Sequence, residues 1–146
     1  MTGKLIGIAR AKKLKGPMEE LDEAIISVSN GFESDARGTK PGRQITILFA
    51  LSWKTACSEL GSDLPWTTRR ANLFVDGITP PQEVGARLAI GNVILEITQE
   101  TEPCFMMDQA KQGLREALTP DWRGGICCNV IEGGRITIGD TAAVLT

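Results

Sequence analysis

Apolar and polar positions alternate over several short segments of the chain, which predicts a mainly β protein. Segments 4–9, 24–29 and 43–50 are rich in aliphatic and β-branched residues, and Gly, Pro and Asn turn signals separate them. Between the last two lies segment 31–43, which is polar and rich in glycine. We expect it to be a surface loop, where binding residues often lie.

Two related stretches, 86–97 and 134–145, extend the β pattern. Each places apolar runs on both sides of Ile-Gly-Asn or Ile-Gly-Asp, which is typical of a tight hairpin turn. Segment 67–77 predicts another strand, with two arginines at its start. The chain thus contains about eight short predicted strands, and this number indicates a β-barrel-like fold.

Helical periodicity interrupts the strands at two places. Segment 51–61 predicts a short helix, with Ser52 as its N-cap and Gly61 closing its C-terminal end. Segment 107–120 predicts a second helix, for which Asp108 is the N-cap. We therefore expect two or three short helices beside the strands.

Composition restricts the functional classes. The chain has 146 residues and a net charge of −2, which suits a single domain over residues 1–146 without the basic excess of a nucleic-acid partner. Its longest apolar stretch is far short of the ~20 residues that a membrane span needs, and no signal-peptide pattern opens the chain. We expect a cytoplasmic protein that binds neither nucleic acid nor a membrane.

The chemistry must rest on few residue types, because the chain contains no histidine and no tyrosine. Its cysteines are Cys57, Cys104, Cys127 and Cys128, and no CxxC pair is present, which argues against a zinc site. Cys57 falls within a predicted helix and is expected to be a packing residue. Cys127 and Cys128 are expected on opposite faces of one strand, with one of them in the core.

Cys104 is the candidate nucleophile or metal ligand. It follows Pro103, which stiffens the backbone, and lies near the start of the second predicted helix, where the helix dipole favours a thiolate. Position alone leaves open the alternative that Cys104 is a packing cysteine under a loop.

Three further residues are candidate anion contacts. Arg70 and Asn72 alternate along the predicted strand and are expected on one face, whereas Arg69 is expected to be plain surface charge. Arg123 precedes Gly124-Gly125, and it could add positive charge where these glycines let the backbone come close to a ligand.

The segments RRANLFVDG, GARLAIGNVILEITQETEPCFMMDQAKQGL and WRGGICCNVIEGGRITIGD together resemble the MOSC domain family, named for the C-terminal domain of molybdenum-cofactor sulfurases. The resemblance covers nearly the whole chain and implies a closed β-barrel of the pyruvate-kinase-barrel type. It also implies involvement with molybdenum cofactor or sulfur transfer.

The resemblance assigns roles to particular residues. Cys104 matches the cysteine that ligates molybdenum in members that reduce N-hydroxylated compounds, and Arg70 and Asn72 match their pterin contacts. Asp35 matches the aspartate of a Gly-Asp-x-His loop element found in many stand-alone members. Arg37 stands where that element has histidine, and a guanidinium can bind phosphate but cannot shuttle a proton near neutral pH.

Three functions stay open from the sequence. The first is a molybdenum-cofactor-binding or sulfur-carrier protein that uses Cys104 and works with a sulfur-transfer enzyme. The second is a molybdenum-dependent reductase of N-hydroxylated compounds, supplied by a separate electron-transfer protein. The third is a non-catalytic binding module. Glu102 stands where those reductases have serine, and its negative charge favours the carrier over the reductase.

Overall fold

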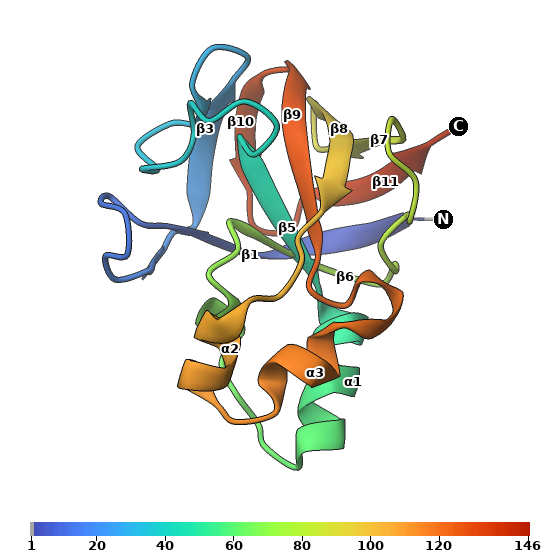
Figure 1. Cartoon of the computed structure of the whole chain (residues 1–146). Coiled ribbons are helices and arrows are strands. Elements are labelled where there is room, and N and C mark those ends of the chain that lie inside the picture. Colours follow the sequence, from blue (N-terminus) through green and yellow to red (C-terminus); the bar gives the residue numbers. More distant parts are fainter. Residues whose placement is uncertain (1) are drawn as a thin grey trace.

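The computed structural model describes residues 2–146, and seven of the strands in that range form a closed β-barrel (Figure 1). In order around the barrel they are β1 (Thr2–Arg10), β11 (Thr141–Leu145), β7 (Arg87–Ile90), β8 (Val93–Glu100), β9 (Ile126–Glu132), β5 (Ile45–Phe49) and β6 (Leu73–Asp76). Neighbouring strands are antiparallel, except that β5 and β6 are parallel. Because β1 pairs with both β11 and β6, the ring closes, and the predicted closed barrel is confirmed.

Smaller elements surround the barrel. A three-stranded sheet contains β10 (Gly134–Thr137), β3 (Glu23–Ser27) and β4 (Gly31–Phe32), and β2 (Glu19–Glu20) extends the end of β1. The helices α1 (Ala50–Leu60), α2 (Phe105–Ala110) and α3 (Leu114–Leu118) gather below one end of the barrel in Figure 1. Two 3₁₀ turns, η1 (Trp66–Arg69) and η2 (Pro120–Trp122), complete the secondary structure. None of the helices within residues 2–146 is long and apolar enough to cross a membrane.

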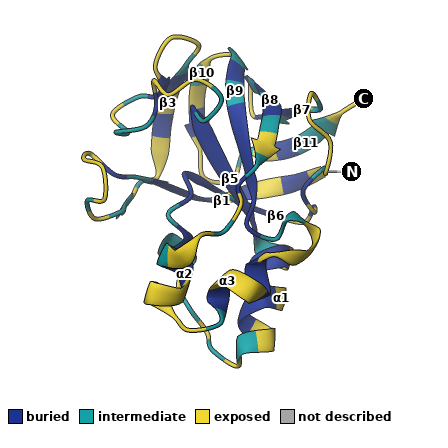
Figure 2. Cartoon of the chain, in the orientation of Figure 1, coloured by how far each residue is buried: buried dark blue, intermediate teal, exposed yellow. Residues whose placement is uncertain are grey.

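Two apolar clusters hold these layers together. The larger fills the barrel and includes Leu5, Ile47, Leu73 and Leu95, each at most 1% exposed. The smaller lies between the barrel wall and the helices; its members are Leu48, Trp53, Ala56, Cys57, Ala71, Met107, Leu114, Ala117 and Leu118. All of β5 is buried, because one face points into the barrel and the other lies under the helices (Figure 2).

One of the two predicted hairpins is confirmed and the other is wrong. β7 and β8 pair directly across Gly91, whose φ of 56° suits the turn. β10 and β11 do not pair with each other, because β10 joins β3 whereas β11 joins β1 and β7. The reason lies at Leu5, which donates its N–H to the Asp140 carbonyl and accepts the Gly139 N–H, so the chain crosses into the barrel.

The first predicted helix is confirmed at Ala50–Leu60, but one of its caps is wrong. Gly61 closes it in the left-handed conformation, with a φ of 66°. Ser52 lies buried inside the helix, and Phe49 occupies the N-cap position.

The second predicted helix is divided into α2 and α3. Lys111 is extended and Gly113 has a φ of 92°, so the helix is interrupted between them. Asp108 lies within α2, and its Oδ1 accepts hydrogen bonds from the backbone N–H groups of Gly113 and Arg115 at 3.2 and 3.0 Å. Its carboxylate therefore caps the start of α3 rather than the start of α2.

Asn72 joins three segments of the barrel. Its Oδ1 accepts hydrogen bonds from the Thr46 N–H at 3.1 Å and the Thr46 hydroxyl at 3.2 Å. Its Nδ2 donates to the Ala9 carbonyl at 3.2 Å, and the residue is only 2% exposed. The amide thus links β1 and β5 just before β6 begins.

We therefore expect Asn72→Ala to lower the free energy of unfolding by about 2–4 kcal/mol, because it leaves several buried polar groups without partners. Urea unfolding followed by circular dichroism measures the change. Asn92→Ala is the matched control, because Asn92 is an exposed turn residue, and it should shift stability by less than about 0.5 kcal/mol. Equal effects of the two substitutions would contradict a structural role for Asn72.

Candidate functional site

A cavity of about 360 Å³ opens beside α2, and we call it the cationic cavity. It is lined by the loop after β1, the loop before β5, the end of η1 and the start of α2. The basic residues that line it are Lys13, Lys15, Arg37, Lys40, Arg43, Arg69 and Arg70, whereas Glu102 is the single carboxylate in its wall. Seven of the chain's 16 basic residues thus line one cavity of a protein whose net charge is −2.

A smaller recess of about 20 Å³ lies between the barrel and η1 and shares four arginines with the cavity. Its walls contain Arg37, Arg43, Arg69 and Arg70, together with Thr46, Thr101 and Gly124. No carboxylate of residues 2–146 lies within 4.0 Å of any of these guanidinium groups. Four converging arginines without ion-pair partners form a site that favours an anion.

Arg69 is the most deeply buried of the four, at 9% exposure. Its Nε donates to the Gly124 carbonyl at 3.0 Å and its Nη2 donates to the Thr101 carbonyl at 2.8 Å. A Cβ on Gly124 would lie 3.1 Å from Nη2 and 2.5 Å from the Thr101 carbonyl oxygen, so this position needs glycine. The prediction that Arg69 is plain surface charge is wrong, because the chain forms η1 here instead of a strand.

Burial lowers the pKa of Arg69 to about 10, and the nearby Arg43 and Arg37 add to this, while Cys104 acts in the opposite direction. The folded state therefore holds the Arg69 proton less tightly than the unfolded chain does. The resulting cost in stability is fully present at neutral pH and disappears only as pH rises from about 10 towards the ordinary arginine value. A bound anion would offset the same cost at neutral pH.

Arg70 and Asn72 do not share a face, contrary to the expected strand alternation. β6 begins only at Leu73, and Arg70 ends η1 in the left-handed conformation with a φ of 66°. Its guanidinium lines the cavity and donates to the Gly16 carbonyl. Asn72 turns into the protein and uses its side-chain oxygen and nitrogen in the hydrogen bonds described above.

Arg37 and Arg43 come from the loop before β5. Arg37 donates to the Arg70 carbonyl at 3.0 Å, and burial is the main reason that its pKa lies below the ordinary value. The Nε of Arg43 is buried and has no hydrogen-bond partner among the residues that the structure describes. A buried donor of this kind indicates a missing acceptor, such as a ligand oxygen.

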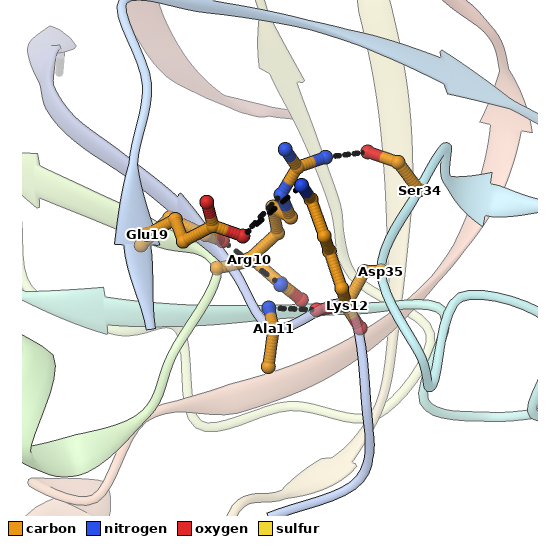
Figure 3. Close-up of polar contacts among 8 residues, drawn as sticks. Arg10, Ala11, Lys12, Glu19, Ser34 and Asp35 are labelled. Carbon is orange, nitrogen blue, oxygen red and sulfur yellow. Dashed lines mark hydrogen bonds and ion pairs between the residues drawn. The ribbon is translucent and has the colours of Figure 1, made fainter. Parts of the chain in front are cut away.

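Asp35 organises the wall of the cavity (Figure 3). Its Oδ1 accepts the Ala11 N–H and its Oδ2 accepts the Arg37 N–H, both at 3.0 Å. Arg10 donates to Ser34 and pairs with Glu19 at 3.4 Å on the same side. These contacts fasten the loop before β5 to the end of β1, so that Arg37 faces the cavity.

Cys104 lies in the wall of the cationic cavity and is exposed. It is the N-cap residue of α2, and its carbonyl accepts the Met107 N–H at 3.0 Å. Cys57, Cys127 and Cys128 are buried. Cys128 lies in the barrel core, and burial raises its pKa well above that of an ordinary thiol.

Arg123 lies apart from the cavity lining. Its Nη1 donates to Glu59 and to the Ala117 carbonyl, both at 3.0 Å, and so ties η2 to α1 and α3. The structure thus brings Cys104, Arg70 and the Asp35 loop together and places Arg123 and Asn72 elsewhere. Sequence reasoning missed the recess arginine Arg43, which stands alone in a polar loop, and it assigned Arg69 to the surface because a strand was expected there.

Comparison with known proteins identifies the family. Residues 35–143 match the family model of the MOSC domain, and the chain belongs to that family, which is associated with molybdenum-cofactor-related proteins. No curated protein sequence matches the chain.

Solved structures support the fold. YuaD protein from Bacillus subtilis superposes with a TM-score of 0.81 at 20% identity, covering 97% of this chain and 94% of that one. YiiM from Escherichia coli superposes with a TM-score of 0.74 at 15% identity, covering 98% of this chain and 70% of that one. YiiM from Geobacillus stearothermophilus superposes with a TM-score of 0.71 at 13% identity, covering 99% of this chain and 73% of that one. At these identities the likeness establishes the shared barrel fold.

Removing one recess arginine should improve stability and weaken anion binding. We expect Arg43→Gln to raise the free energy of unfolding by about 0.5–1 kcal/mol in low-salt buffer, because it relieves like-charge repulsion. Inorganic phosphate should raise the melting temperature of the unaltered protein and do so much less in the variant.

Thermal unfolding with and without phosphate tests both expectations. Arg115→Gln is the matched control, because Arg115 is exposed on α3 and forms no ion pair within residues 2–146. It should respond to phosphate like the unaltered protein. A phosphate response that is the same in all three proteins would show that the recess does not bind the anion.

Proposed function

We propose that this protein binds a phosphate-bearing molybdenum cofactor, or the sulfur destined for it, in the cationic cavity, with Cys104 as the reactive thiolate. One observation carries the proposal: an exposed cysteine shares a cavity with four arginines that lack carboxylate partners. The family assignment supports it, because the MOSC family is associated with molybdenum-cofactor-related proteins.

The residues in the cavity suit the anionic part of such a cofactor. The buried Nε of Arg43 lacks an acceptor, and Arg69 directs two of its nitrogens to main-chain carbonyls, which leaves Nη1 without a protein partner among residues 2–146. These groups would hold a phosphate. A thiolate suits molybdenum, because soft sulfur ligands match a sulfur-bound metal, and the bound metal would supply redox chemistry at this wall.

Two features favour sulfur handling over firm metal binding. Glu102 lies in the cavity wall, where its carboxylate would repel an anionic metal centre. Asn72, expected to contact the pterin, is instead occupied within the barrel. A carrier needs only an accessible thiolate beside bound anion, and Cys104 is exposed.

In the carrier role the covalent chemistry is thiol–persulfide exchange at Cys104. Its thiolate attacks the terminal sulfur of a donor persulfide, so that one S–S bond forms on Cys104 while the donor's S–S bond breaks and its thiolate leaves. The exchange needs no external oxidant. The partner would be a sulfur-transfer enzyme that carries the donor persulfide. In the reductase alternative, a separate electron-transfer protein would approach the same open cavity.

Purification from a host that makes molybdenum cofactor tests the proposal. We expect cyanide-releasable sulfur on the unaltered protein and a loss of at least about tenfold in Cys104→Ala, because the thiolate is the point of attachment. Molybdenum per chain, measured by mass spectrometry, distinguishes a cofactor-bound protein from an empty carrier.

Cys57→Ala is the matched control, because Cys57 is buried in α1, away from the cationic cavity. It should keep the sulfur and any metal. Two results would refute the role of Cys104 and favour a non-catalytic binding module. One is that neither the unaltered protein nor either variant carries sulfur or metal. The other is that Cys104→Ala and Cys57→Ala carry equal amounts.

A further inference from the structure

The cationic cavity holds more positive charge than one phosphate group would balance. The recess contains four arginines, and Lys13, Lys15 and Lys40 line the outer part of the cavity. One phosphate monoester carries a charge of about −2 at most near neutral pH. The lysines therefore need an explanation beyond a single phosphate at the four arginines.

These lysines differ from the neighbouring Lys12. The Nζ of Lys12 lies 3.9 Å from Glu19, whereas Lys13, Lys15 and Lys40 have no carboxylate within 4.0 Å in residues 2–146. Their charges face a cavity in which Glu102 is the one negative side chain. This arrangement leaves the outer part of the cavity open to a second anionic group.

The backbone at Lys15 is strained in a way that a glycine would relieve. Its φ is 61°, in the left-handed region that side-chain-bearing residues rarely adopt. The next residue, Gly16, offers its carbonyl to the Arg70 guanidinium, so the loop after β1 is tied directly to the recess.

An apolar rim adjoins the lysines. Leu14 is 70% exposed and lines the cavity together with Met106. Apolar side chains beside cations suit a ligand with an aromatic face next to its charged groups. A flat base could stack here while its phosphates reach inwards.

We propose that the cationic cavity binds a nucleoside diphosphate unit, with the inner phosphate against the four arginines, the outer phosphate at Lys13, Lys15 and Lys40, and the base on the apolar rim. This inference rests on the proposed function, because the same cavity holds the cofactor or sulfur. It adds that the natural ligand carries a pyrophosphate and a nucleobase. A long nucleic acid is disfavoured, because the cations converge on one cavity of an acidic protein.

Calorimetric titration of the full chain with inorganic phosphate, pyrophosphate, ADP, GDP and CDP tests the inference. We expect affinity to rise by about tenfold or more from phosphate to pyrophosphate, and again to at least one nucleoside diphosphate. Replacing Lys13, Lys15 and Lys40 together by glutamine should remove most of the gain for pyrophosphate and leave phosphate binding within about twofold.

Three further variants separate the contributions. Leu14→Ser combined with Met106→Ser should reduce nucleoside diphosphate affinity to that of pyrophosphate. Lys15→Gly should keep or improve the melting temperature and still weaken pyrophosphate binding. A control that replaces the exposed Lys4, Lys54 and Lys111 by glutamine should change none of the affinities.

The outcomes distinguish this inference from the function on which it rests. Phosphate binding that depends on Arg43, without any gain for pyrophosphate or nucleotides, would overturn the inference and keep the anion site. Equal losses for all ligands in the triple lysine variant would also overturn it. A single-stranded oligonucleotide that binds more tightly than every nucleoside diphosphate would overturn it in favour of a nucleic-acid surface. Failure of every anion to bind would overturn the inference together with the anion site.

Discussion

The site depends on one buried guanidinium, that of Arg69. It donates hydrogen bonds to the carbonyls of Gly124 and Thr101, which belong to the segments before β9 and after β8. The same side chain lines the cationic cavity and the smaller recess, and the absence of a Cβ at Gly124 gives it room. Because Arg69 holds these segments together, the barrel end, the start of α2 and the position of Cys104 are linked through it.

Stability and binding are opposed in this arrangement. Four arginines share a recess without carboxylate partners, and burial together with neighbouring charge lowers the pKa of Arg69 to about 10. The folded chain accepts this cost because the apolar clusters and the Asn72 hydrogen bonds stabilise the surrounding barrel. An anionic ligand would offset this cost and so stabilise the folded state. The proposed anion would therefore meet positive charge that the fold already holds in place.

The candidate site was only partly predictable. The place of Cys104 after Pro103 left a packing role open, and the resemblance to the MOSC family made it the functional candidate; the structure places it on the cavity wall. Arg69 and Asn72 were misplaced for a single reason, since a strand was expected where η1 forms and strand alternation then assigned their faces. Arg43, Lys13, Lys15 and Lys40 were missed, because they come from loops whose meeting depends on contacts such as Asp35 with Ala11.

Local patterns in the sequence were enough to predict the mainly β class, the first helix with its Gly61 cap and the hairpin at Gly91. These features follow from local periodicity and turn chemistry, which act within a few residues. The pairing of β11 with β1 instead of β10, and the convergence of arginines from two distant segments, become visible only in the folded chain. Such choices depend on which polar groups remain unpaired after the barrel closes, and local sequence does not contain that information.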